Sequence, residues 1–214
     1  KRQEYKEQRN GNMAQRSIDP ATGVIVAEYE EHDDDAVERA AAAAAARFDT
    51  WRARSFAERA ALLRAAADRL ETEADRWAAL MAAEMGKPLP QGRSEAEKCA
   101  WVCRYYAEHG EDFLATEVVE SDASRSFVAF RPLGPILAVM PWNFPFWQVF
   151  RAAAPALMAG NTMLLKHASN VPGCARAIEE IFRDAGLPSG AFQALLIGSD
   201  RVEGLIADDR IRGV

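Results

Sequence analysis

The second half of the chain places short apolar runs between longer segments of mixed character. Residues 136–140 and 162–165 are two such runs, and a helix-length segment rich in Ala, Phe and Leu separates them. Short apolar runs without alternation are typical of parallel strands buried on both faces. We therefore predict a strand–helix–strand unit, then a second helix, a third strand at 192–197, a short helix at 202–207 and a further strand from 211.

The first half of the chain instead carries the periodicity of helices. Residues 32–50 include an uninterrupted alanine run with high helix propensity. Ser55 and Glu58 have the spacing of a capping box and open a second helix, which we expect to end at Gly86. Apolar residues mark one face of that helix: Leu63, Ala66, Leu70, Ala74, Trp77 and Met81. A third helix is predicted over 94–107 and continues weakly beyond it.

Three segments lie outside these elements. Residues 1–12 have almost no apolar content and are expected to be disordered. Residues 16–30 predict a hairpin because turn residues separate two extended pieces, and residues 117–131 predict two strands around a polar turn. The chain thus divides into a tail at 1–12, a helical part at 13–116, a hairpin at 117–132 and an α/β part at 133–214.

Composition narrows the classes of function. The 214 residues are 49% hydrophobic, and the formal net charge of −6 argues against a nucleic-acid or anionic-membrane partner. No apolar run approaches the roughly 20 residues of a membrane span, and no signal-peptide core follows the basic start. Three cysteines do not make a disulfide framework, so a cytoplasmic location is expected. Cys99 and Cys103 share a helix face without further ligands nearby in sequence, which favours buried thiols over a metal site.

Two polar residues stand at predicted strand ends, where parallel sheets bind their ligands. Asn143 precedes a helix in whose first turn we expect Pro145. The Asn143 amide could donate to an oxygen that gains negative charge, or it could be the N-cap of that helix. Lys166 could donate to ribose hydroxyls or a 2′-phosphate, or simply leave its strand into solvent. No G-x-G-x-x-G fingerprint is present in this unit.

Four motifs together carry a family resemblance: EMGKP at 84–88, PWNFP at 141–145, GNTMLLK at 160–166 and AGLP at 185–188. From about residue 17 to 214 the chain resembles the aldehyde dehydrogenase superfamily, and within it the succinate-semialdehyde dehydrogenases. The resemblance implies an α/β fold with N-terminal helices, part of a Rossmann-like parallel sheet and an oligomerisation hairpin at 117–132. It further implies a homo-oligomer that oxidises an aldehyde, expected to be succinate semialdehyde, with NADP or NAD.

The resemblance also assigns roles to residues. Asn143 is expected to stabilise the intermediate that forms when a cysteine thiolate attacks the aldehyde. The expected cofactor-binding residues are Met140, Pro141, Trp142, Lys166, Ser169 and Gly198. Many NAD-preferring members have glutamate three residues after the lysine, where this chain has Ser169, so we expect NADP or tolerance of both. His167 replaces the proline common in the family and receives no role.

Substrate contacts are expected on the helix after Asn143. The resemblance places Arg151 where it would pair with the distal carboxylate of succinate semialdehyde. An ion pair with a neighbouring acid is the alternative for this arginine. Phe146, Trp147 and Phe150 could line the substrate tunnel or simply pack the helix.

The family mechanism needs a cysteine nucleophile and a glutamate base as well. The resemblance places both beyond residue 214, together with the glycine motif that meets the cofactor pyrophosphate. We therefore expect no aldehyde oxidation by the 214-residue chain alone. The alternative hypothesis is a non-catalytic nucleotide-binding or assembly module that pairs with full-length subunits through the hairpin at 117–131.

Overall fold

The computed structural model describes residues 14–214, so the tail expected at 1–12 lies outside the described residues. The strands are β1 (Ala14–Ile18), β2 (Ile25–Glu30), β3 (Glu117–Val118), β4 (Phe127–Val128), β5 (Pro135–Met140), β6 (Thr162–His167) and β7 (Phe192–Ala194). The α-helices are α2 (Asp34–Arg52), α3 (Phe56–Thr72), α4 (Ala74–Met85), α5 (Leu89–Phe113), α6 (Trp147–Met158), α7 (Pro172–Asp184) and α8 (Val202–Ile206), and a 3₁₀ turn, η2, covers Ser199–Arg201.

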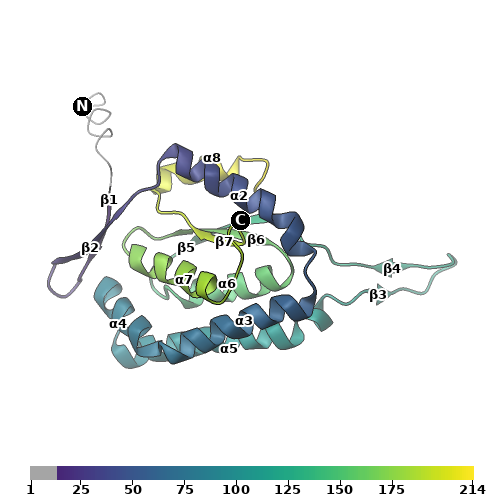
Figure 1. Cartoon of the computed structure of the whole chain (residues 1–214), viewed down its shortest axis with the longest axis horizontal. Helices are drawn as coiled ribbons and strands as arrows, with labels where there is room; N and C mark the ends of the chain where they lie inside the picture. Colours follow the sequence, from purple (N-terminus) through teal and green to yellow (C-terminus); the bar gives the residue numbers. More distant parts are fainter. Residues whose placement is uncertain (1–13) are drawn as a thin grey trace.

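The parallel sheet lies between two layers of helices (Figure 1). Helices α2 and α8 cover one face, and α6 and α7 cover the other. Helices α3, α4 and α5 form a further layer against α6 and α7. Every residue of β6 is buried, as the run without alternation predicted. The α/β class and the parallel sheet are thus confirmed. None of the helices between residues 14 and 214 combines the length and the apolar character of a membrane-spanning segment.

The three strands of this sheet run in the order β5-β6-β7, all parallel. The prediction of a strand over 192–197 was wrong at its C-terminal end, because β7 stops at Ala194. Beyond it, the Leu196 carbonyl accepts a hydrogen bond from His32 N (2.8 Å), so the chain turns toward the end of β2. The strand expected from 211 is reduced to one parallel bridge between Ile136 and Gly213.

The helices depart from the sequence prediction in three places. The single helix expected from Ser55 to Gly86 is two helices, α3 and α4, with a break at Glu73 (φ −108°, ψ 21°). Its predicted apolar face is buried across the break: Leu63, Ala66, Leu70, Ala74, Trp77 and Met81. Helix α5 begins before the predicted residue 94, with Pro90 in its first turn, and it continues beyond residue 107 to Phe113. Helix α6 begins at Trp147, so Pro145 precedes it rather than standing in its first turn.

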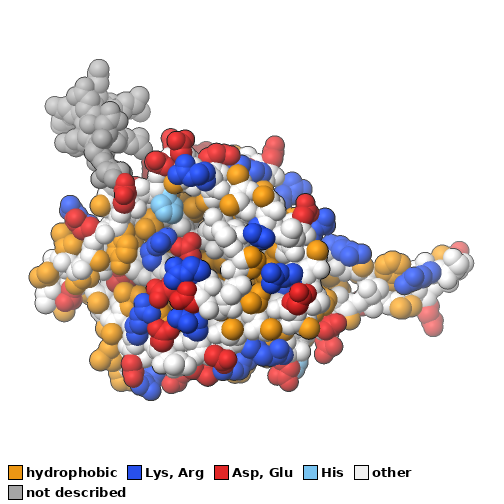
Figure 2. Space-filling view, in the orientation of Figure 1, with side chains coloured by type: hydrophobic (Ala, Val, Ile, Leu, Met, Phe, Trp, Pro, Cys, Tyr) orange, Lys and Arg blue, Asp and Glu red, His pale blue; other side chains and the backbone are white. Residues whose placement is uncertain are grey.

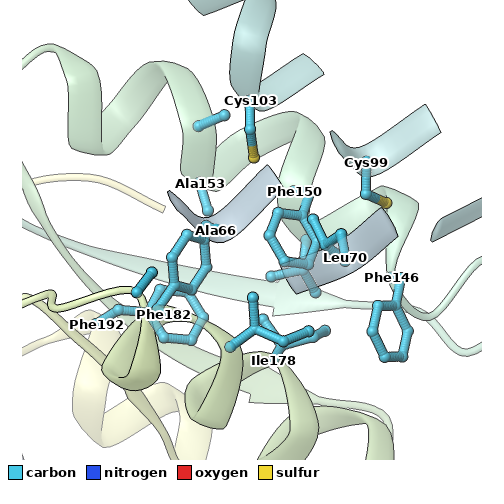
Figure 3. Close-up of a cluster of buried hydrophobic side chains, with 14 of the residues drawn as sticks. Ala66, Leu70, Cys99, Cys103, Phe146, Phe150, Ala153, Ile178, Phe182 and Phe192 are labelled. Carbon is cyan, nitrogen blue, oxygen red and sulfur yellow. The ribbon is translucent and has the colours of Figure 1, made fainter. Parts of the chain in front are cut away.

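A row of aromatic side chains joins α6, α7 and β7 in the core (Figure 3). Ring centroids are 6.3 Å apart for Phe146–Phe150, 5.0 Å for Phe150–Phe182 and 4.7 Å for Phe182–Phe192. The thiols of Cys99 and Cys103 lie in the same core, which confirms the prediction of buried free cysteines. Burial raises the pKa of Cys103 to about 12 and raises that of Cys99 well above its ordinary value.

The hairpin of β3 and β4 projects away from the rest of the molecule (Figure 1). Val118 and Phe127 form a cross-strand pair, and both side chains are exposed, at 83% and 49%. Figure 2 shows apolar side chains along this arm. Both residues of β3 and both residues of β4 are exposed, so neither face of the hairpin is buried within one chain.

Candidate active site

The carboxyl ends of the three parallel strands meet at one edge of the sheet. Met140 pairs with His167 in the strand register, so the turn at 141–146 starts beside the end of β6. Ser169 lies in the loop after β6 and Gly198 in the segment after β7, at the same edge. The structure therefore gathers the residues predicted for the site from three separate segments, at the edge where ligands of parallel sheets bind.

Asn143 lies in the middle of the turn between β5 and α6 and is exposed, as are Pro141 and Trp142 beside it. Helix α6 starts at Trp147, and Phe146 takes its N-cap position. The hypothesis that Asn143 is the N-cap is therefore wrong. The role of Asn143 in stabilising an oxyanion stays a prediction, and its exposed amide is free of the capping task that would compete with it.

A buried carboxylate from α5 holds the end of this turn, and the sequence did not predict it. Glu95 Oε1 accepts hydrogen bonds from Phe146 N and Trp147 N, both at 2.9 Å. Glu95 Oε2 pairs with the ammonium group of Lys87, which is also buried and lies 4.2 Å from the centre of the Phe144 ring. The carboxylate thus satisfies two free N–H groups at the positive end of α6. Neither Glu95 nor Lys87 stands at a predicted strand end, so their contact with this turn had no local sign in the sequence.

His167 holds the same turn from β6 and was given no role by the sequence. Its Nε2 lies 2.8 Å from the Pro145 carbonyl oxygen, and its Nδ1 accepts from Ala168 N at 2.8 Å. The ring is only 3% exposed. Burial lowers the pKa of His167 to about 4, although its backbone hydrogen bonds act in the opposite direction. The imidazole is therefore neutral at pH 7.

Lys166 lies within β6 rather than just past the strand end, and it is 6% exposed. Burial lowers the pKa of its ammonium group, and the negative charge of Glu31 partly opposes this shift. The Lys166 ammonium group forms no hydrogen bond or ion pair within residues 14–214, although the charge of Glu31 acts on it. Its donors therefore remain available at the carboxyl end of the sheet.

Arg151 and a neighbouring groove lie on the α6 side of the turn. Arg151 is exposed, and no carboxylate of the described residues pairs with it, so the alternative of a structural ion pair is not observed. A groove of ≈ 540 Å³ includes Phe144, Trp147 and Lys98 in its walls, and the Lys98 ammonium lies 4.0 Å from the centre of the Trp147 ring. Phe146 and Phe150 are fully buried and pack the helix instead (Figure 3).

The profile of the aldehyde dehydrogenase family matches residues 6–214. The chain belongs to the aldehyde dehydrogenase family. The resemblance carried by the motifs at 84–88, 141–145, 160–166 and 185–188 is thereby confirmed.

Related aldehyde dehydrogenases match over most of this chain. A probable succinate-semialdehyde dehydrogenase [NADP(+)] of Synechocystis is 58% identical over 200 residues, which cover 94% of this chain and 44% of that protein. Succinate-semialdehyde dehydrogenase [NADP(+)] 1 of Mycobacterium tuberculosis is 50% identical over 198 residues, covering 91% of this chain and 43% of that protein. The chain therefore spans less than half the length of these relatives.

Solved structures confirm the fold. Gox0499, studied for its cofactor and substrate selection, superimposes with a TM-score of 0.92 at 37% identity, over 94% of this chain and 44% of that one. Succinic semialdehyde dehydrogenase from Streptococcus pyogenes, in complex with NADP+, superimposes with a TM-score of 0.89 at 34% identity, over 92% and 44%. The arrangement of α2, the sheet and the outer helices is thus that of known aldehyde dehydrogenases.

The donor set at the end of β6 fits a nicotinamide dinucleotide with a 2′-phosphate. Lys166 offers an ammonium group without a protein partner among residues 14–214, and Ser169 offers an exposed hydroxyl where a carboxylate would repel a phosphate. Gly198 has ordinary extended dihedrals (φ −67°, ψ 163°), but a Cβ there would contact the Asp200 carboxylate.

Proposed function

We propose that this chain forms the cofactor-binding and oxyanion-stabilising part of an NADP-dependent succinate-semialdehyde dehydrogenase. The observation that carries the proposal is the parallel pairing of β5 with β6, which sets the Asn143 turn beside the strand that holds Lys166. The names of the relatives from Synechocystis and Mycobacterium support both the substrate and the cofactor.

The residues at the ends of β6 and β7 would hold the cofactor. When bound, NADP supplies the acceptor for the hydride that the aldehyde carbon loses. Lys166 would donate hydrogen bonds to the adenosine ribose or its 2′-phosphate, and Ser169 would add a hydroxyl without repelling the phosphate. Met140, Pro141 and Trp142 would lie along the cofactor on the β5 side, and Gly198 would let it pass close to the backbone.

The turn and α6 would receive the aldehyde. The Asn143 amide would donate to the carbonyl oxygen as that oxygen gains negative charge. The guanidinium group of Arg151 would pair with the distal carboxylate of succinate semialdehyde, because its fork of donors matches a carboxylate. Trp147, in the wall of the groove, lies one helical turn before Arg151, so an aldehyde chain along α6 would contact both.

None of the three cysteines suits the nucleophile that this chemistry needs. Attack on a carbonyl requires a thiolate, and burial raises the pKa of Cys99, Cys103 and Cys174 above the ordinary value. Our proposal therefore assigns the nucleophile to none of them. We expect the 214-residue chain to bind the cofactor without oxidising aldehydes, as the hypothesis of a nucleotide-binding module also requires.

Cofactor titration of the purified chain tests the proposal. We expect NADP to bind more tightly than NAD in calorimetric titrations. Lys166→Ala should weaken NADP binding by roughly 10- to 100-fold, the loss expected for a hydrogen bond to a charged group. Ser169→Glu should shift the preference toward NAD. The matched control is Lys98→Ala, which removes an exposed lysine of α5 that lies against Trp147 and not on β6.

Equal affinities for NADP and NAD that neither substitution changes would contradict the cofactor assignment. Absence of binding by a chain that is folded by circular dichroism would do the same. The alternative function, an assembly module without cofactor binding, would then remain. The exposed apolar hairpin of β3 and β4 is the observation that supports it.

A further inference from the structure

The last two residues of β6 contact different parts of the molecule. Lys166 is influenced by the charge of Glu31, which follows β2, whereas His167 bonds to Pro145 in the turn before α6. We propose that His167 is a positioning residue, which ties the turn carrying Asn143 to the strand carrying Lys166. The importance of this tie for catalysis rests on the proposed function, whereas its effect on the turn does not.

The hydrogen bonds of His167 select one tautomer. Nδ1 lies 2.8 Å from Ala168 N, whose N–H must donate, so Nδ1 is an acceptor. The ring proton is then on Nε2, which donates to the Pro145 carbonyl oxygen at 2.8 Å. Because both ring nitrogens are engaged and the ring is buried, the imidazole is fixed in one orientation.

Glu95 holds the end of the turn that leads into α6. The Glu95 carboxylate accepts from Phe146 N and Trp147 N, immediately after the carbonyl that His167 binds. Met140 fixes the other side through its pairing in β5. Only the exposed residues 141–144 lie between these fixed points, and Asn143 is one of them. Two buried side chains from β6 and α5 therefore limit how far the Asn143 amide can move.

A hydrogen-bond donor stabilises developing charge only if it is already in place when the charge forms. The tie through His167 also keeps a constant spacing between the turn and the strand that carries Lys166. A proline at position 167 would have no side-chain donor for the Pro145 carbonyl.

Three variants of the purified chain test the positioning role. His167→Phe keeps a ring but removes the donor, and His167→Gln restores an N–H donor at a similar distance from the backbone. His109→Phe, which replaces a partly exposed histidine of α5, is the control. Amide hydrogen exchange of residues 141–147 is compared with that of the β6 strand in each protein.

We expect His167→Phe to speed exchange in residues 141–147 by about tenfold, the effect of losing one hydrogen bond. Exchange in β6 should stay unchanged, the glutamine variant should approach wild type, and His109→Phe should match it. Nitrogen NMR of wild type should show His167 protonated on Nε2. Protonation on Nδ1, or unchanged exchange in His167→Phe, would overturn the proposal. The NMR measurement uses the wild-type protein, so it decides even if the phenylalanine variant does not fold.

Cofactor binding separates this inference from the proposed function. His167→Phe should weaken NADP binding less than Lys166→Ala does, because Lys166 and Ser169 are unchanged and only the contacts of Pro141 and Trp142 in the loosened turn are affected. A wild-type chain that binds no NADP would refute the proposed function, while the exchange data would still decide the role of His167. A glutamine variant that exchanges as fast as the phenylalanine variant would overturn the positioning role, since the donor alone would then not hold the turn.

Discussion

At the residue scale, burial and hydrogen bonding decide which form of a titratable side chain the fold accepts. His167 is the clearest case in this chain, because its Nδ1 must accept from Ala168 N, and an imidazolium ion has no acceptor. Burial, partly opposed by hydrogen bonds to the backbone, sets the pKa of His167 to about 4. The native state thus disfavours a proton that the unfolded chain binds readily at mildly acidic pH.

We predict that acid destabilises the protein through His167. The unfolded histidine has a pKa of 6.5 and the folded one about 4, so its contribution is complete above pH 6.5 and is lost as the pH falls toward 4. The loss amounts to about 3 kcal/mol of the free energy of unfolding. Urea denaturation of wild type and His167→Gln at several pH values measures it. Carboxylates titrate in both proteins, so parallel pH curves for the two would contradict the prediction.

How much of the site the sequence can predict depends on distance along the chain. Asn143 and Lys166 could be singled out because each stands at the end of an apolar run, which is a local pattern. His167 and Glu95 could not, because their partners in the turn lie 22 and 51 residues away. Residues that carry the proposed chemistry were thus visible in the sequence, whereas those that hold the turn became visible only in the fold.

At the scale of elements, the same contrast appears at helix ends. The Ser55–Glu58 capping box of α3 is confirmed, with Ser55 N donating to Glu58 at 2.8 Å and Glu58 N donating to Ser55 at 3.2 Å. Helix α6 has no such local signal, since Phe146 at its N-cap offers no side-chain acceptor. Glu95 of α5 takes this task across the helix interface, which explains why the start of α6 was predicted two residues too early.

We predict that Glu95→Ala destabilises the fold far more than loss of an ordinary cap. The change leaves the Lys87 ammonium buried without its carboxylate and two α6 amides without an acceptor. Breaking a buried pair in this way costs about 3–5 kcal/mol. The matched control, Ser55→Ala at the exposed start of α3, should cost about 1 kcal/mol. Urea denaturation followed by tryptophan fluorescence measures both.

A second substitution separates the buried charge from the lost cap. Lys87→Met in the Glu95→Ala background should recover part of the lost stability, because it removes the unpaired charge. A Glu95→Ala protein no less stable than Ser55→Ala would contradict the assignment of Glu95 as the element that anchors α6.

At the scale of the whole molecule, the order of the helices and strands could be predicted from the sequence. The points at which long-range contacts interrupt or shorten them could not. The βαβ pattern and the helical lead-in are local in sequence, and the structure confirms both. The break at Glu73 was hidden because the apolar stripe continues across it, and β7 was shortened by a contact between Leu196 and His32. Such long-range contacts compete with the strand pattern and leave no periodic signal.

The hairpin of β3 and β4 is the part of the fold with little support from its own chain. Two strands of two residues each, with apolar side chains exposed, gain little from their own pairing. Exposed apolar surface of this kind marks an interaction site, and unpaired strand edges favour pairing with another chain. We therefore expect the hairpin to mediate self-association, as its resemblance to the family's oligomerisation region implies.

Charge placed on the hairpin tests this expectation. Val118→Lys combined with Phe127→Lys puts two like charges directly opposite each other at the exposed pair, where burial in an interface becomes costly. Sedimentation velocity over a range of concentrations should then show a smaller species than wild type. Ala123→Lys, at the exposed hairpin tip, is the control and should leave the association unchanged. At concentrations at which wild type is also dissociated, the thermal midpoint should change little in any variant, because neither Val118 nor Phe127 belongs to the core. Unchanged sedimentation of the double variant would mean that the surface joining the copies lies elsewhere on the molecule.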